Sequence, residues 1–228
     1  MNTTTPGKFI VIEGTDGSGK ATQTQLLAQR LLSEGISFEV TDFPQYGTPS
    51  AFFVEKYLRG EYGTIEEVGP HKASYFYALD RFDKSFDMKR WLSEGKNIIS
   101  NRFTTSSMAH QTAKLDSAEE QDVFLDWLDH LEYEDLGIPR PNLVVFLYVP
   151  PEVGQKLVAE KAAREYTHGK SHDIHEDSLD HLTKASETYL RIAKKFGWLQ
   201  IDCVKDGRLM SPEEIHELIY DVVKDYLA

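Results

Sequence analysis

The fold of this chain is decided by the stretch Phe9-Ile10-Val11-Ile12-Glu13-Gly14-Thr15-Asp16-Gly17-Ser18-Gly19-Lys20-Ala21-Thr22. Its apolar start, residues 9–12, predicts a fully buried parallel strand. Gly14, Gly19 and Lys20 then match the G-x-x-x-x-G-K spacing of a phosphate-binding loop, in which backbone N–H groups and a helix N-terminus converge on one anion. A glycine-rich turn without a ligand is the alternative, but the strand before the loop and the amphipathic helix after it favour phosphate binding.

Length and composition predict a single acidic domain over residues 1–228. The chain has 228 residues, of which 40% are apolar, and a net charge of −12. This charge argues against nucleic acid or an anionic membrane as a bulk partner, although a polyanionic substrate remains compatible with basic residues gathered at one site. The single cysteine, Cys203, excludes an internal disulfide, and no apolar run reaches transmembrane length, so we expect a cytoplasmic protein.

Apolar runs alternate with helical patterns along the rest of the chain. We expect strands at residues 9–12, 37–42, 97–100, 143–149 and 198–202. We expect helices at residues 20–34, 50–59 (capped by Ser50), 69–94, 117–136, 151–164, 177–196 and 212–227, with a loop at 101–115 that passes into a further helix. This alternation predicts an α/β fold with three layers and a doubly wound, five-stranded parallel sheet, whose ligands bind at the carboxyl ends of the strands.

The first two strands are followed by side chains that suit an acceptor site. Asp16 either reaches past the phosphates toward an acceptor or hydrogen-bonds its own turn, and its spacing supports both equally. Phe43 and Tyr46 flank a proline after the second strand. They either line the acceptor site or pack in an ordinary turn, which spacing alone slightly favours.

Tyr77 and Arg81 lie four residues apart in the predicted helix 69–94 and therefore share one face. A ring that stacks on a base, beside a guanidinium that binds the same base, requires this arrangement. Arginine only donates hydrogen bonds, so it would bind O4 of thymine or uracil and reject the amino group of cytosine. A core tyrosine beside a surface arginine paired to an acid is the alternative, and these two residues taken alone favour it.

Arg102 directly follows the third predicted strand, at the edge where the cleft is expected. Its planar, always charged guanidinium suits a phosphoryl group in transit, and a solvent-facing arginine is the alternative. Classical P-loop ATPases end such a strand with an aspartate that serves magnesium, and this strand lacks one.

The polar segment 161–177 predicts either a lid or a metal site. Its charged and imidazole side chains include Lys161, Arg164, Lys170, His172, Asp173, His175 and Glu176. The spacing of its histidines and acids matches no standard zinc motif. We therefore expect a lid that closes basic side chains over phosphates and excludes water, which would otherwise compete as the nucleophile.

Taken together, these stretches resemble the thymidylate kinase family of P-loop nucleoside monophosphate kinases over most of the chain. The resemblance rests on five motifs in their order and spacing: Gly14-Thr15-Asp16-Gly17-Ser18-Gly19-Lys20, Phe43-Pro44-Gln45-Tyr46-Gly47, Tyr77-Ala78-Leu79-Asp80-Arg81, Asn101-Arg102-Phe103 with Ser106 and Gln111, and Asp173-Ile174-His175-Glu176 with Tyr189.

The resemblance implies a role for each motif. ATP would bind Gly14, Thr15, Asp16, Gly17, Ser18, Gly19, Lys20, Ala21 and Thr22. The acceptor would bind Asp16, Phe43, Tyr46, Tyr77, Arg81, Arg102, Ser106, Ser107 and His110. Lys20, Arg102 and Arg164 would be catalytic, in a lid made of Lys161, Arg164, Lys170, Asp173, His175 and Glu176. Since the loop has no arginine at Gly17-Ser18, the resemblance implies that Lys161, Arg164 and Lys170 take the role of a loop arginine as a group.

Three residues depart from the family pattern, and two of them, Ala21 and Asn101, bear on magnesium. Ala21 stands where a hydroxyl residue often touches the ion, and Asn101 and Phe103 replace the acid and the tyrosine of an Asp-Arg-Tyr motif. We therefore expect Mg²⁺ to be held largely by phosphates and water, with Asp16 and Thr22 as candidate protein ligands.

The implied activity is ATP-dependent phosphorylation of dTMP to dTDP for dTTP biosynthesis, by a homodimer. The alternatives are a kinase for another monophosphate such as dUMP, a deoxynucleoside kinase, and a weakly active or non-catalytic nucleotide-binding homologue. His110 stands where a tyrosine often guards against a ribose 2′-hydroxyl, which bears on the choice between deoxyribose and ribose. The lack of an Asn-Lys-x-Asp motif argues against a GTPase switch.

Overall fold

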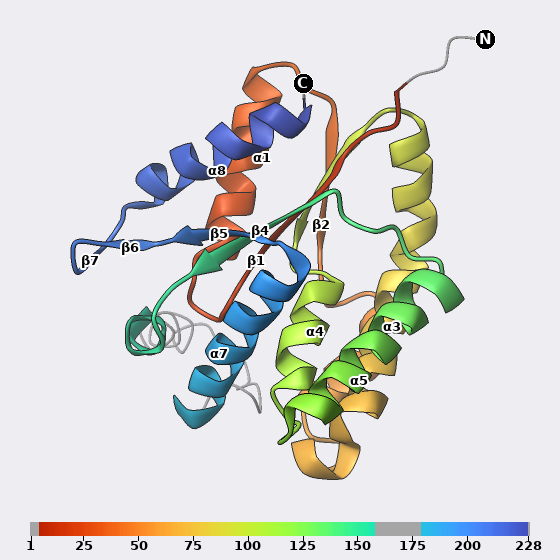
Figure 1. Ribbon diagram of the computed structural model, residues 1–228. Coiled ribbons are helices and arrows are strands. Elements are labelled where there is room, and N and C mark those ends of the chain that lie inside the picture. The colour runs from red at the N-terminus through yellow and green to blue at the C-terminus, as the bar shows by residue number, and fades with distance from the viewer. Residues whose placement is uncertain (1–4, 158–178, 228) are drawn as a thin grey trace.

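A five-stranded parallel sheet forms the centre of the computed structural model, which describes residues 5–157 and 179–227, with side chains from residue 183 in the second range (Figure 1). The strands are β1 (Phe9–Gly14), β2 (Phe38–Asp42), β3 (Asn97–Asn101), β4 (Leu143–Tyr148) and β5 (Leu199–Asp202). They lie in the order β2-β3-β1-β4-β5, and each neighbouring pair is parallel. The predicted α/β class and the five-stranded sheet are confirmed.

Both faces of the sheet are buried, because helices cover each of them and successive strand residues point to opposite faces. Ile10 and Ile12 pack in one cluster with residues of α1 (Lys20–Ser33) and α8 (Pro212–Leu227). Phe9 and Val11 point to the opposite face. That face is covered by α3 (Ile65–Ser93), α4 (Thr104–Thr112), α5 (Ala118–Asp129) and α7 (Leu179–Phe196) (Figure 1). The predicted three layers are therefore confirmed.

The central position of β1 decides where ligands can bind. The connections that leave β1 and β4 run in opposite directions along the sheet, so the strand order reverses beside β1. Open α/β sheets bind ligands at such a reversal, beyond the carboxyl ends of the strands. The phosphate loop leaves β1 at this point.

One predicted helix start is wrong, and another is confirmed with a further helical turn before it. Ser50 does not cap a helix over 50–59. Instead it lies in the 3₁₀ turn Pro49–Ala51 before α2 (Phe52–Leu58), and its hydroxyl donates to Asp80. The predicted start of the long helix at residue 69 is confirmed, because Gly69 has a non-helical backbone with φ 72° and ψ 168° and the helix continues from Pro70. A short helical segment that begins at Ile65, where Thr64 and Glu67 form a capping box, lies directly before this break and is included in α3.

The predicted helix 117–136 divides into two parts. Its start is confirmed by a capping box between Ser117 and Glu120. After α5 the chain continues as the π-helical segment η2 (His130–Asp135), and the N–H of Leu136 donates to the carbonyl of Leu131, five residues back. A π turn contains one more residue than an α turn, so it changes which side chain faces inward.

A short helical segment and a hairpin complete the described part of the fold. Residues 151–157 are helical as predicted, and the rest of that predicted helix lies outside the described residues. A short hairpin of β6 (Val204–Lys205) and β7 (Arg208–Leu209) follows β5 and is not predicted from the sequence.

None of the helices in the described part of the chain is long and apolar enough to span a membrane.

Candidate active site

The phosphate loop joins β1 to α1 and has the backbone that its motif requires. Gly19 is the N-cap of α1 with φ 86°, a left-handed conformation that favours glycine. A Cβ atom on Gly14 would lie 2.5 Å from the Ser18 hydroxyl and 2.6 Å from the Leu147 carbonyl oxygen, so a larger residue does not fit. The positive end of the α1 dipole is therefore held at the carboxyl end of β1, where it can bind an anion.

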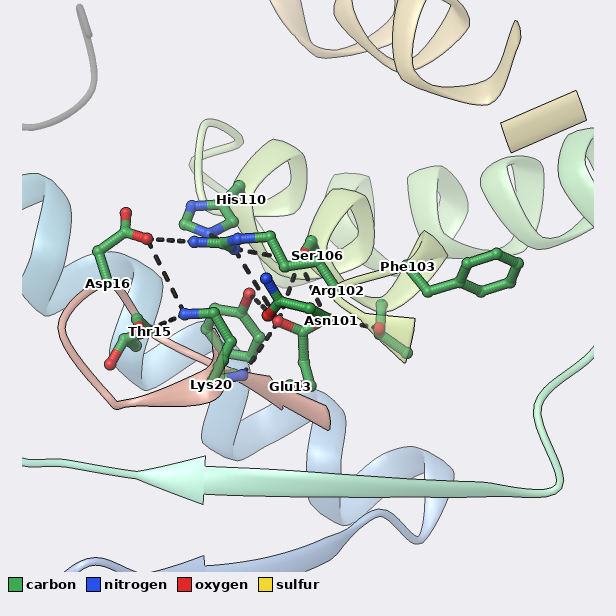
Figure 2. A network of polar contacts seen from close by, with 12 residues as sticks. Glu13, Thr15, Asp16, Lys20, Asn101, Arg102, Phe103, Ser106 and His110 are labelled. Carbon is green, nitrogen blue, oxygen red and sulfur yellow. Dashed lines mark hydrogen bonds and ion pairs between the residues drawn. The ribbon is translucent and has the colours of Figure 1, made fainter. Parts of the chain in front are cut away.

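Lys20, the first residue of α1, folds back over the loop (Figure 2). Its side chain is buried, and Nζ donates a 2.6 Å hydrogen bond to the carbonyl oxygen of Thr15. The same atom lies 4.0 Å from Oδ1 of Asp16. A full positive charge is thus already in place beside the loop where a phosphate would bind.

Asp16 and Arg102 form an ion pair between the phosphate loop and the end of β3 (Figure 2). Their side chains remain 27% and 21% exposed. Burial opposes the charged form of Asp16, but Arg102 and Lys20 outweigh it and hold the pKa of this carboxyl well below its ordinary value. Arg102 has φ 62°, a left-handed backbone that is costly for a residue with a Cβ atom and is concentrated at functional sites.

Two residues of α4 hold Arg102 from the other side. Nη1 donates to the hydroxyl of Ser106 at 3.1 Å and lies 3.4 Å from Nε2 of His110 (Figure 2). Arg102 is therefore fixed between the loop and α4, and the alternative of a solvent-facing arginine is excluded.

Glu13 is a fully buried carboxylate next to the phosphate loop. It accepts hydrogen bonds from the hydroxyls of Thr105 at 2.6 Å, Ser106 at 2.9 Å and Tyr189 at 2.9 Å. Burial, together with the charge of Glu13, raises the pKa of the Tyr189 hydroxyl well above its ordinary value, so it stays a donor. No sequence motif assigns a role to Glu13, although an acid at the end of a buried apolar strand indicates that polar groups must lie around it.

A cavity of about 460 Å³ lies beside the phosphate loop, a volume typical of a small-molecule site. It brings together all the acceptor-site residues that the resemblance implies: Asp16, Phe43, Tyr46, Tyr77, Arg81, Arg102, Ser106, Ser107 and His110. Ala21 lines it too, so the loop forms one of its walls. The contribution of each residue to ligand binding stays a prediction.

The aromatic lining of the cavity comes from two elements. Phe43 is buried, and its ring centroid lies 5.5 Å from that of Phe103, whereas Tyr46 is exposed. Tyr77 is half-buried and packs edge-on against Tyr57 at 6.3 Å. Phe43 therefore packs in the core and borders the cavity at the same time, so the two alternatives for this residue do not exclude each other.

The loop that carries Phe43 and Tyr46 is tied to α3 by Asp80. The carboxylate of Asp80 accepts the backbone N–H of Gln45 at 2.9 Å and the hydroxyl of Ser50 at 2.6 Å. Asp80 is buried, so these bonds fix the loop relative to the helix that carries the other half of the cavity lining.

Arg81 is buried at the cavity wall, which excludes the alternative of a surface arginine. Nε donates to Oε2 of Glu132 at 2.7 Å, and Nη2 donates to Oε1 of Glu132 and, at 2.9 Å, to the hydroxyl of Ser107. Glu132 belongs to the π-helical segment η2, 51 residues further along the chain. No local sequence pattern links the two residues, which is why sequence analysis finds the arginine and misses the acid.

Asp42 is a third acid, after Glu13 and Glu132, to which no sequence pattern points. It lies opposite Asn101 in the register of β2 and β3, and Nδ2 of Asn101 donates to its Oδ1 at 2.8 Å. Burial raises the pKa of Asp42, and the hydrogen bond from Asn101 opposes this shift. A carboxylate therefore lines the cavity at this edge of the sheet, on β2 instead of β3.

The donor atoms around the loop fit a magnesium ion that is held mainly by phosphates and water. Ser18 Oγ and Asn101 Oδ1 are buried oxygens without a hydrogen-bond partner in the described part of the chain. Across the same residues, no three acids, histidines or cysteines are grouped to hold a metal directly. Of the two candidate ligands, Asp16 lines the cavity, whereas Thr22 is exposed and does not. Mg²⁺ commonly uses one or two carboxylates with waters and substrate phosphates, which agrees with these donors.

The predicted lid residues Lys161, Arg164, Lys170, Asp173, His175 and Glu176 lie outside the described residues, as does the alternative metal ligand His172.

A phosphate loop on the central strand, with a charged cavity beside it, defines the chain as a P-loop nucleotide-binding protein with room for a second ligand. Comparison with known proteins identifies the family within this class. The thymidylate kinase family model matches residues 12–217. The chain belongs to the thymidylate kinase family, as the sequence motifs predict.

Individual relatives agree over nearly the whole chain. The chain is 32% identical to a probable thymidylate kinase of Thermococcus onnurineus, over 96% of this chain and 98% of the relative. It is 26% identical to the thymidylate kinase of Schizosaccharomyces pombe, over 96% of this chain and 92% of the relative. The solved structure of the Candida albicans thymidylate kinase has the same fold, with a TM-score of 0.74 at 22% identity, over 97% of this chain and 92% of that one.

Proposed function

We propose that this protein transfers the γ-phosphoryl group of ATP to the phosphate of dTMP. An oxygen of the dTMP phosphate would attack the γ-phosphorus, the bond to the β-phosphate oxygen would break, and dTDP and ADP would result. The observation that carries this proposal is the position of Arg102, which lies between the phosphate loop and the cavity and is paired to Asp16 on the loop. Membership of the thymidylate kinase family supports dTMP as the acceptor.

In this proposal the protein positions two anions and neutralises the charge between them. The loop N–H groups and Lys20 bind the ATP phosphates, and Arg102 binds the acceptor phosphate. The phosphate of dTMP is already an anion near neutral pH, so no catalytic base is needed. Asp16 can then release Arg102 and turn toward the 3′-hydroxyl of the acceptor.

The far end of the cavity would select the base. Tyr77 would stack on thymine, and Arg81 would donate to its O4 carbonyl. Phe43 and Tyr46 would line the site. Ser106, Ser107 and His110 would contact the sugar and base from α4, where His110 replaces a bulkier tyrosine.

Mg²⁺ is the proposed cofactor. Bound with ATP, it would supply positive charge to the phosphates during transfer. Asp16 and the unpaired oxygens of Ser18 and Asn101 are the groups of this chain that would hold it, chiefly through water.

We also propose a homodimer formed through α3. Tyr75, Leu79 and Phe86 are exposed and recur at the spacing of one helix face, and Phe86 is the most exposed of them at 61%. A monomeric mass in light scattering would contradict this. A lid over 161–177, one domain over 1–228 and a cytoplasmic location remain predictions of the sequence.

A panel of acceptors tests the proposed function. With Mg²⁺ and ATP, the coupled release of ADP is measured for dTMP, dUMP, dCMP, dGMP and UMP. We expect dTMP to have the highest kcat/KM. A clear preference for dUMP would identify another monophosphate kinase, and binding of ATP and dTMP without formation of dTDP would identify a non-catalytic homologue.

A further inference from the structure

The ion pair between Arg81 and Glu132 is the most deeply buried one at the cavity. The two side chains are 2% and 0% exposed, and both carboxylate oxygens of Glu132 accept from Arg81. Oε2 of Glu132 also accepts the hydroxyl of Thr104 at 2.6 Å. Glu132 is therefore held from two elements, and its carboxylate holds the guanidinium in one plane.

The contacts of Arg81 leave few of its donors for a ligand. A guanidinium has five N–H groups. Nε–H and both N–H groups of Nη2 are bonded to Glu132 and Ser107, and one N–H of Nη1 makes a longer 3.5 Å contact to the carbonyl of Phe103. The remaining N–H of Nη1 has no acceptor in the described part of the chain. Since Arg81 lines the cavity, this N–H is the one donor of its guanidinium that a ligand in the cavity could use.

The backbone around Glu132 is unusual as well. Glu132 lies in the π-helical segment η2, where an added residue shifts the helical face, and such segments occur frequently at functional sites. Stability alone does not account for the pair, because a buried ion pair is often no better than two apolar side chains of similar volume. A π turn that places a charged residue against a cavity arginine indicates a role in that cavity.

We propose that Glu132 is a positioning residue for base selection: it fixes Arg81 so that a single N–H donor faces position 4 of a pyrimidine base. A keto oxygen there is bound, and an amino group there is rejected. Glu132 acts only through Arg81 and does not itself touch the acceptor. This inference rests on the proposed phosphorylation of a pyrimidine monophosphate.

Glu132→Gln tests the proposal, since it keeps the shape and removes one of the two acceptors that Arg81 needs. We expect KM for dTMP to rise about 10- to 100-fold, as for loss of a charged hydrogen bond. The preference for dTMP over dCMP should narrow by a similar factor, while KM for ATP stays unchanged. Glu134→Gln is the matched control, because Glu134 lies two residues away in η2 and is exposed, where it accepts from Arg140.

A second variant separates loss of positioning from loss of folding. Glu132→Asp keeps the buried charge but withdraws the carboxylate by one methylene group, so the fold should survive while the two-point contact to Arg81 is lost. We expect its kcat/KM ratio for dTMP over dCMP to fall, in the same direction as in Glu132→Gln. Circular dichroism and thermal unfolding establish that each variant is folded before kinetics are compared.

The outcomes separate this inference from the proposed function. If the wild type prefers dTMP and folded Glu132→Gln or Glu132→Asp keeps both its KM and its preference, the role of Glu132 is refuted and the kinase stands. Equal losses with dTMP, dCMP and ATP, or failure of both variants to fold, would make the pair structural and also refute it. A wild type that prefers dCMP would overturn both proposals.

Discussion

Two arginine–carboxylate pairs flank the same cavity, and they differ in burial. Asp16 and Arg102, at the phosphate loop, are 27% and 21% exposed. Arg81 and Glu132, at the far wall, are 2% and 0% exposed. Water and ligands can reach both members of the first pair, whereas in the second pair Glu132 is enclosed by protein and only Arg81 borders the cavity.

This difference indicates two kinds of use for the same chemistry. A partly exposed pair can exchange its carboxylate for a phosphate at little cost, because solvent and the incoming anion compensate the separated charges. Separation of a buried pair would leave a charge without solvent or partner. The outer pair is therefore suited to open when an acceptor phosphate arrives, and the inner pair is suited to remain closed and orient a donor.

Removal of the charge beside the outer pair should have the largest effect. In Lys20→Ala, we expect kcat/KM with dTMP to fall by about a thousandfold or more, because the loop loses its contribution to the charge that develops during transfer. Coupled ADP release measures this, and circular dichroism establishes that the fold is kept. Lys224→Ala on the exposed face of α8 is the control. Wild-type activity in Lys20→Ala would contradict the proposed mechanism.

The stability of the two pairs can be compared with matched isosteric variants in urea. We expect Glu132→Gln to lower the free energy of unfolding by about 3–5 kcal/mol, since it leaves the Arg81 charge buried and unpaired. For Asp16→Asn we expect less than about 1 kcal/mol, since Arg102 stays partly solvated.

The double variant Arg81→Met/Glu132→Leu serves as a check on that comparison. Because it removes both charges together, it should recover most of the stability that Glu132→Gln loses. Equal losses for Glu132→Gln and Asp16→Asn would remove the distinction between the pairs.

The smallest expected effect is a pH dependence of the outer pair. The pKa of Asp16 is lowered in the folded protein from an ordinary value of 3.8, so its contribution to stability is complete well above that value. The contribution is lost as the pH falls through 3.8 toward the folded-state pKa. The difference in unfolding free energy between wild type and Asp16→Asn, below about 1 kcal/mol at pH 7, should therefore shrink at acidic pH. A difference that grows under acid conditions would contradict this.

The regular parts of the fold were predictable because local patterns determine them. Runs of apolar residues identified all five strands of the sheet, and the capping box at Ser117 identified the start of α5. The predictions failed where a local sequence signal was overridden by a contact with residues distant in the chain, or where no local signal exists. Ser50 is a good capping residue by type, but its hydroxyl bonds Asp80, thirty residues away. The π turn after α5 has no periodic signal that distinguishes it from a continued helix.

The site shows the same division. Each residue implied for the acceptor site within the described part of the chain lines one cavity, because short motifs sit at the ends of strands that must meet at one edge. Glu13, Asp42 and Glu132 were missed because each gains its importance from a partner distant in sequence.

The sequence by itself determined the phosphate loop, the parallel sheet and the family, since these depend on spacing within a few residues and on apolar periodicity. Only the tertiary structure decided which charges are paired and how deeply. It buries the Arg81–Glu132 pair and leaves the Asp16–Arg102 pair open. The physical reason is that the strength and reversibility of an ion pair depend on its exposure to water, and exposure is a property of the packed molecule rather than of any segment of the chain.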